Sequence, residues 1–118
     1  MNPKHTPASS SVPFHVLAVA LELIEQVRTP LAQIQQHDGD LAKQLRRAAS
    51  SVPLNLSEGN RRVGKDRRHF FRIAAGSADE VRACLRVALA WGYCEHAAVA
   101  ESLARVDRVL AMTHRLTH

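Results

Sequence analysis

The segment Leu45-Arg46-Arg47-Ala48-Ala49-Ser50-Ser51-Val52-Pro53-Leu54-Asn55-Leu56-Ser57-Glu58-Gly59 decides how this chain folds. Apolar residues in and just before it recur at spacings of four, three, four and four: Leu41, Leu45, Ala48, Val52 and Leu56. This spacing puts them on one face of a helix. Pro53 has no N–H for the carbonyl of Ala49, so we expect a kink there. The pattern predicts a helix held by packing, which Gly59 ends in the left-handed conformation.

Length and composition favour a single helical domain. The chain has 118 residues, of which only 4% are aromatic, and Ala and Leu are common. This balance favours closely packed helices over a sheet, which would contain more β-branched and aromatic residues. The two cysteines, Cys84 and Cys94, have no metal-ligand spacing, which is typical of a reduced, cytoplasmic protein.

The first residues differ in composition from the rest. Residues 1–12 are rich in Ser and Pro, and we expect them to form a flexible N-terminal arm before a domain of residues 13–118. The apolar run 12–21 continues past Glu22 and Glu25 in the same pattern, so we interpret it as a core helix instead of a signal peptide. No segment is apolar for long enough to span a bilayer, and no membrane partner is expected.

Helical spacing recurs in four segments, which we expect at about 13–28, 41–59, 65–91 and 95–115. Residues 31–36 are expected to form a separate turn of helix or a bent extension of the first. Short turns between the segments predict an up-down-up-down four-helix bundle, all-α in class. Gly76 is expected to let a neighbouring backbone come close. Outside the second helix, the predicted inner faces hold Phe14, Leu17, Leu21, Ile24, Val27, Phe70, Ile73, Ala74, Ser77, Val81, Leu85, Ala88, Val99, Leu103, Val106 and Leu110.

Positive charge is concentrated in one part of the chain. The net charge is +5, but residues 43–72 hold nine basic and two acidic residues, a local 9 − 2 = +7. Cations at the start of the third helix oppose its dipole, so they are not placed there for helix stability. Phosphates would relieve their repulsion, which favours nucleic-acid binding over a solvated charged face or pairing across a subunit contact. The candidate nucleic-acid-binding residues are Arg46, Arg47, Arg61, Arg62, Lys65, Arg67, Arg68 and Arg72.

Three blocks of the sequence resemble a known family. They are residues 45–59, the run Phe70-Phe71-Arg72-Ile73-Ala74-Ala75-Gly76-Ser77-Ala78-Asp79-Glu80, and Ala88-Leu89-Ala90-Trp91-Gly92-Tyr93. In this order they are similar to the small bacterial four-helix-bundle proteins encoded in intervening sequences of large-subunit ribosomal RNA genes. The accessory variability determinant of diversity-generating retroelements is also similar. The resemblance covers about residues 14–116.

The resemblance implies an assembly and partners. It implies that the bundle forms a ring-shaped homopentamer, and for the retroelement branch it implies a basic surface that contacts structured RNA and a reverse transcriptase. Self-association also follows from apolar residues left beside the inner stripes, because a bundle this small cannot bury them all. These residues are Leu54, Val87, Leu89, Trp91 and Val109.

We expect no enzymatic activity, cofactor or metal. One carboxylate and one amide in residues 53–59 are too few for acid–base catalysis. We therefore interpret Pro53, Asn55, Glu58 and Gly59 as structural: Pro53 sets the kink, and Asn55 and Glu58 satisfy freed backbone or arginine groups. His114 and His118 share a helical face but lack a third ligand. The expected function is non-enzymatic nucleic-acid binding, and the alternative is a scaffold or protein-interaction oligomer.

Overall fold

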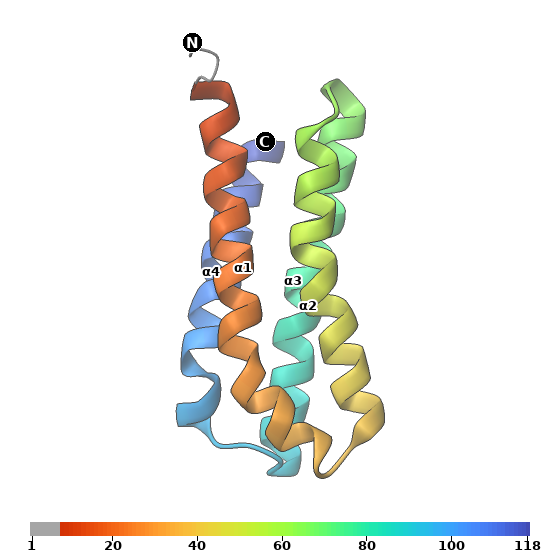
Figure 1. The fold of residues 1–118 in the computed structure, drawn as a ribbon, viewed down its shortest axis with the longest axis vertical. Coiled ribbons are helices and arrows are strands. Elements are labelled where there is room, and N and C mark those ends of the chain that lie inside the picture. The colour runs from red at the N-terminus through yellow and green to blue at the C-terminus, as the bar shows by residue number, and fades with distance from the viewer. Residues whose placement is uncertain (1–7) are drawn as a thin grey trace.

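The computed structural model describes residues 8–118, and their side chains from His15 onward. Within these residues the chain forms four helices: α1 (Ala8–Gln35), α2 (Gly39–Asn60), α3 (Gly64–Trp91) and α4 (His96–Thr117). Successive helices run in opposite directions, α2 packs along α3, and α1 packs along both α2 and α4 (Figure 1). No strand occurs among the described residues, so the all-α prediction is confirmed.

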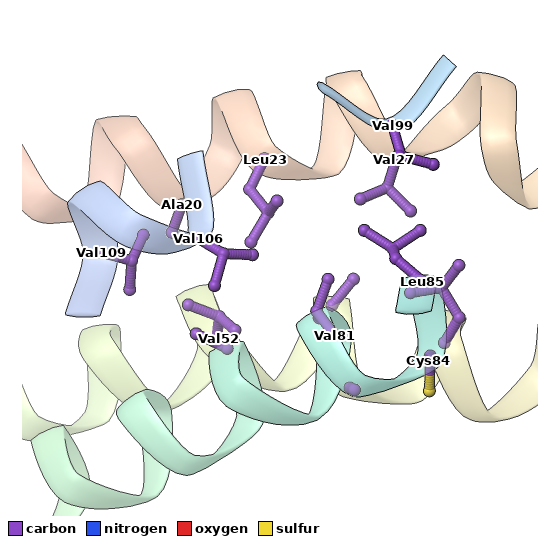
Figure 2. Packing of buried hydrophobic residues seen from close by; sticks show 14 of the residues in the cluster. Ala20, Leu23, Val27, Val52, Val81, Cys84, Leu85, Val99, Val106 and Val109 are labelled. Atoms are coloured by element: carbon purple, nitrogen blue, oxygen red, sulfur yellow. The ribbon is translucent and has the colours of Figure 1, made fainter. Parts of the chain in front are cut away.

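The core runs the length of the bundle and takes side chains from all four helices. Figure 2 shows Leu23 and Val27 of α1 facing Val52, Val81 and Leu85 across the interior. The side chains that face them from α4 are Val99, Val106 and Val109. Burial of aliphatic side chains of this size contributes about 1.5–3 kcal/mol each, so this core supplies most of the favourable free energy of folding.

Helix α1 departs from the prediction in its bounds and in its inner face. It begins at Ala8, so residues 8–12 of the predicted arm belong to the helix, and the rest of that arm lies outside the described residues. The helix also continues through Thr29-Pro30 to Gln35 without a separate turn. The buried stripe is Val16, Val19, Ala20, Leu23, Val27 and Ile34. Val27 is buried as predicted, and the side chain of the predicted Phe14 lies outside the described residues. The predicted Leu21 is exposed, and Leu17 and Ile24 are half-buried, because in this part of the helix the buried stripe lies about one residue away from the predicted one.

Helix α2 carries the predicted apolar face. Leu41, Leu45, Ala48, Val52 and Leu56 are all buried. The carboxylate of Asp38 accepts a hydrogen bond from the backbone N–H of Leu41 at 3.0 Å, which makes Asp38 the N-cap of this helix. The helix continues through Pro53 as far as Asn60.

Gly59 has a different role from the one predicted. Among the described residues the glycines with positive φ are Gly64 and Gly92, whereas Gly59 is a buried helical residue of α2. A Cβ at Gly59 would lie 2.7 Å from Cε1 of Phe71 and 3.1 Å from Cβ of Phe70. Glycine at this position therefore lets α3 approach α2 closely. Gly76, for which the close approach was predicted, is exposed, and a Cβ there would meet nothing within 4 Å.

The inner faces of α3 and α4 agree with the prediction at most positions. Ala74, Val81, Leu85 and Ala88 are buried as predicted, but Phe71 replaces Phe70 in the core and Ile73 is exposed. On α4, Val99 and Val106 are buried, Leu103 and Leu110 are half-buried, and Ser102, Val109 and Thr113 fill the interior. Val109 is therefore a core residue, not leftover surface as the sequence suggested.

Ion pairs connect helices across the surface. Arg105 of α4 donates to Glu22 of α1 at 3.1 Å and to Glu101 one turn earlier at 2.6 Å. Arg82 of α3 joins Asp107 of α4 at 3.1 Å. These pairs are exposed, so solvent screens their charges and they add little to the stability of the bundle. Within residues 8–118 no helix has a stretch long and apolar enough to cross a bilayer.

Candidate nucleic-acid interface

The eight predicted cations divide into separate groups in the structure. Arg61, Arg62, Lys65, Arg67 and Arg68 gather where α2 ends and α3 begins, which we call the basic tip. This tip lies at the end of the bundle that also holds the end of α4 (Figure 1). Arg46 and Arg47 lie farther down α2, and the 14 residues from Arg47 to Arg61 span about 21 Å at the helical rise of 1.5 Å per residue.

Glu58 organises the first two cations of the basic tip. The Nε of Arg62 donates to Oε2 of Glu58 at 2.9 Å, and Arg61 donates to the other carboxylate oxygen. The hydrogen bond from Arg62 and the nearby positive charge of Arg61 lower the pKa of Glu58 below its usual value, although partial desolvation opposes them. Glu58 therefore stays ionised near neutral pH and holds two guanidinium groups at the end of α2.

Two aromatic rings hold two of the arginines. The guanidinium carbon of Arg62 lies 5.0 Å from the ring centroid of Phe70, and that of Arg67 lies 4.9 Å from the ring centroid of Phe71. A guanidinium over a ring face at this distance gains about 0.5–2 kcal/mol. Arg67 also donates to the backbone carbonyl of Asn60 at 3.4 Å, near the end of α2. These contacts fix Arg67 against the protein, so it is the least available cation of the tip.

Lys65 and Arg68 are the most available cations of the basic tip. Both side chains are exposed, and neither forms an ion pair among the described residues. They stand on the first turn and a half of α3, whose N-cap, Val63, gives no side-chain hydrogen bond. Uncapped N–H groups at a helix start attract anions, and Asp66 is the acidic residue in this turn. Two free cations beside an uncapped helix start form a surface suited to phosphate.

Arg72 lies outside the tip. Its Nη2 donates to the carbonyl oxygen of Thr117 at 3.4 Å, which ties α3 to the end of α4. His114 and His118 are nearby, with ring centroids 4.0 Å apart. A metal site needs further ligands, and no group of three or more His, Cys, Asp or Glu residues comes together among the described residues.

Arg46 and Arg47 project from α2 into solvent. Neither is ion-paired within the part of the chain that the structure describes. Arg47 lies on the wall of a groove of about 540 Å³ between α2 and α3, together with Lys43, Asp40 and Glu80. The charges of these four residues balance, so the groove itself is not a basic channel.

A hydroxyl and amide network closes the middle of the α2–α3 contact. Asn55 donates from Nδ2 to the carbonyl oxygen and to the hydroxyl of Ser51, both at 2.9 Å, and the hydroxyl of Ser77 bonds that of Ser51 at 2.8 Å. The backbone carbonyl that Asn55 bonds is therefore that of Ser51. The carbonyl that Pro53 leaves without a donor is that of Ala49, and Asn55 does not bond it. The network contains no titratable group and has the character of a structural contact.

Sequence reasoning missed one cluster at the other end of the bundle. The ring of Tyr93 lies nearly parallel to that of His37, with centroids 5.1 Å apart, and nearly parallel to that of Trp91 at 6.2 Å. Gly92 ends α3 in the left-handed conformation, and the N–H of Tyr93 donates to the carbonyl oxygen of Ala88 at 2.9 Å. This reversal brings Tyr93 beside Trp91. The Trp-Gly-Tyr run was a signal in the sequence, but the contribution of His37 depends on the tertiary fold.

The thiols offer no nucleophile. Cys84 and Cys94 are free and buried, and burial raises the pKa of both, which keeps them protonated near neutral pH. Cys84 is a core residue, as the sequence predicted.

Comparison with known proteins gives the chain a family. Residues 14–115 match the family model described as 23S rRNA-intervening sequence protein. This match spans most of the chain, so the protein belongs to that family, in agreement with the resemblance read from residues 14–116. No curated protein matches the chain.

Proposed function

We propose that this member of the 23S rRNA-intervening sequence protein family binds structured RNA or DNA without catalysis, through the cations of α2 and of the basic tip. The proposal rests on one observation: Lys65 and Arg68 are exposed and unpaired among the described residues, beside the uncapped start of α3. Like charges placed together without partners repel each other, and a phosphate is a ligand that relieves this repulsion. The family is named for an intervening sequence of 23S rRNA, so ribosomal RNA is one of the structured RNAs to include in the binding test.

The expected mode of binding is backbone contact. The described surface has no recognised base-reading motif, and phosphate contacts position a protein on a duplex without reading its sequence. In this proposal specificity comes from the shape of the nucleic acid and from a partner protein. For a gene inside a retroelement, that partner is a reverse transcriptase. We place the protein in the reducing cytoplasm, where Cys84 and Cys94 remain thiols.

Self-association belongs to the same proposal. Among the side chains that the structure describes, five of the six exposed large apolar ones lie between Leu54 and Trp91, on α2, α3 and the turn that joins them. Leu54 is 69% exposed in the second half of α2, and Val87 and Ile73 are exposed on α3. Apolar patches of this kind mark contacts between subunits. We propose that the α2–α3 side joins copies of the chain into a closed ring of five, with α2 bent at Pro53.

A salt series tests the nucleic-acid proposal. Binding of the purified protein to structured RNA and to duplex DNA is measured from low to high salt for the wild type and for Lys65→Ala/Arg68→Ala. Because each neutralised phosphate contributes about 0.7–0.9 to the slope of log K against log salt, the double variant is expected to have a slope shallower by about 1.4–1.8. Arg108→Ala is the matched control, since it removes an exposed arginine from α4.

The outcomes separate this proposal from its alternative. A shallower slope in the double variant, with Arg108→Ala like the wild type, supports phosphate contact at the basic tip. An absence of binding at low salt, or equal slopes in all three proteins, contradicts it. The alternative, a scaffold or protein-interaction oligomer that does not touch nucleic acid, is then favoured by the apolar α2–α3 side.

A further inference from the structure

Helix α1 carries a second apolar face, which points away from the bundle. From His15 onward most of its exposed positions recur at spacings of three and four residues, and we call this line the outer stripe: Ala18, Leu21, Glu25, Arg28 and Ala32. Leu21 is 49% exposed, and three large side chains beside the stripe are only half-buried: Leu17, Ile24 and Leu31. A helix on the surface of a bundle usually has a polar outer face, so this stripe has the character of a contact.

The groove between α2 and α3 lies apart from this stripe. Helix α1 packs against α2 and α4 and lies diagonally across the bundle from α3 (Figure 1). The groove, of about 540 Å³, is lined by residues of α2 and α3 alone. By helical spacing, the exposed Leu54 and Ile73 continue its lining at one end and the exposed Val87 at the other. The groove therefore has a polar middle between apolar ends.

The outer stripe matches the groove in length and in pattern. Ile73 to Val87 along the groove and Ala18 to Ala32 along the stripe are each 14 residues apart, about 21 Å at the helical rise of 1.5 Å per residue. The charged residues of the stripe also lie in its middle, between apolar ends. A helix that lies in a groove in this register buries its apolar ends against those of the groove.

The charges in the two middles complement each other. Four charged residues line the groove, and none forms an ion pair among the described residues: Asp40, Lys43, Arg47 and Glu80. Glu25 and Arg28 of the stripe are also unpaired within the described part of the chain, whereas Glu22 is held by Arg105. The acid and the base of the stripe thus have opposite charges to meet in the groove. Such pairing leaves one of the two groove cations, 2 − 1 = 1, for phosphate.

We propose that the outer stripe of α1 of one copy lies in the α2–α3 groove of the next copy. The proposal rests on the self-association in the proposed function, and it names the second surface of that contact. The contact is heterologous, because each copy gives its stripe to one neighbour and its groove to another. Contacts of this kind close into a ring when the rotation between copies allows it.

Contacts between like surfaces fit the structure less well. Two outer stripes packed together would bury a strip about 21 Å long and about 10 Å wide on each copy, well below the roughly 800 Å² of a stable interface. Two grooves packed together would leave Leu21 and its apolar neighbours in water. The heterologous contact covers both faces at once, and in the groove α1 touches two helices of the partner instead of one.

Two blocked variants test the proposal by mixing. Leu54→Glu places a carboxylate at the groove and keeps the stripe, whereas Leu21→Glu places one on the stripe and keeps the groove. Each variant alone is expected to sediment at the protomer mass of 13.0 kDa. An equal mixture is expected to give a pair of 2 × 13.0 = 26.0 kDa, because the stripe of the first fits the groove of the second and no further copy can add.

Two further variants keep the test independent of any one substitution. Ala111→Glu adds a carboxylate to an exposed residue of α4, off both surfaces, and is expected to assemble like the wild type. Ala32→Glu is a second variant of the stripe and is expected to behave as Leu21→Glu does. It replaces Leu21→Glu if circular dichroism shows that the latter loses helix.

The outcomes separate this proposal from the one on which it rests. A mixture that stays at 13.0 kDa contradicts the heterologous contact and indicates that like surfaces pair. If both stripe variants assemble like the wild type while Leu54→Glu dissociates, the α2–α3 contact stands and its proposed occupant is wrong. A wild type that sediments at the protomer mass at every concentration overturns both, whereas the salt series with Lys65→Ala/Arg68→Ala decides nucleic-acid binding separately.

Discussion

The ring of Phe71 lies directly against the α-carbon of Gly59. A Cβ at Gly59 would be 2.7 and 2.8 Å from two ring carbons of Phe71, closer than such atoms approach in proteins. Phe71 is fully buried near the start of α3, and Gly59 is buried near the end of α2. This contact sets how closely the two helices approach beneath the basic tip, and it shapes the surface on which Lys65 and Arg68 stand.

Gly59→Ala is expected to destabilise the fold by about 1–2 kcal/mol. Overpacking a dense core costs about 1–3 kcal/mol, and the better helix propensity of alanine returns up to about 1 kcal/mol. The measurement is the free energy of unfolding from denaturant titration. A variant as stable as the wild type would show that the ring of Phe71 moves aside without cost.

Gly76→Ala is the matched control and is expected to have the opposite sign. Gly76 is an exposed helical residue of α3, and a Cβ there meets no atom within 4 Å. Alanine has the higher helix propensity, so we expect stabilisation by about 0.5–1 kcal/mol in the same titration. Destabilisation would mean that Gly76 lies against another copy of the chain.

The carboxylate of Glu58 is expected to make stability sensitive to acid. Its pKa is lowered in the folded protein, chiefly by the hydrogen bond from Arg62. A lowered folded pKa contributes stability that is present above the unfolded pKa of about 4.3 and is lost as the pH falls through the folded value. Wild type should therefore lose more stability than Glu58→Gln between about pH 5 and pH 3. Parallel pH profiles of the two proteins would contradict the pairing.

Leu54→Glu is expected to disrupt self-association. Leu54 is 69% exposed on the proposed subunit contact, and a carboxylate there would have to be desolvated for copies to associate. Sedimentation should show the wild type as an oligomer and the variant shifted toward the protomer mass of 13.0 kDa. Ala111→Glu is the control, since it adds the same charge at an exposed residue of α4. Equal masses for all three proteins would remove the α2–α3 side as the contact.

Arg46 and Arg47 are expected to act separately from the basic tip. They lie about 21 Å along α2 from Arg61, beyond the Debye length of about 8 Å at physiological salt. Arg46→Ala/Arg47→Ala should make the salt slope for a long duplex shallower by about 1.8, and the loss should add to that of Lys65→Ala/Arg68→Ala. A slope unchanged by the α2 pair would confine nucleic-acid contact to the tip.

The sequence by itself determined the number of helices, the all-α class and the apolar face of α2. These features depend on the local spacing of apolar residues, and that spacing is the same whichever residue begins the helix. The same reasoning placed the stripe of α1 about one residue away and named Phe70 in place of Phe71. Several apolar residues follow one another in these helices, and the spacing alone does not show which of them faces the neighbours.

Only the tertiary structure decided what the special residues do. Gly59 could have ended α2 by its own conformational freedom, but its neighbour Phe71 comes from another helix and is twelve residues away. The eight cations form one cluster along the chain, but the length of α2 divides them, and contacts to Phe71 and Thr117 hold Arg67 and Arg72 in place. The stack of His37 on Tyr93 joins two turns far apart in sequence, and helix packing alone brings such rings together.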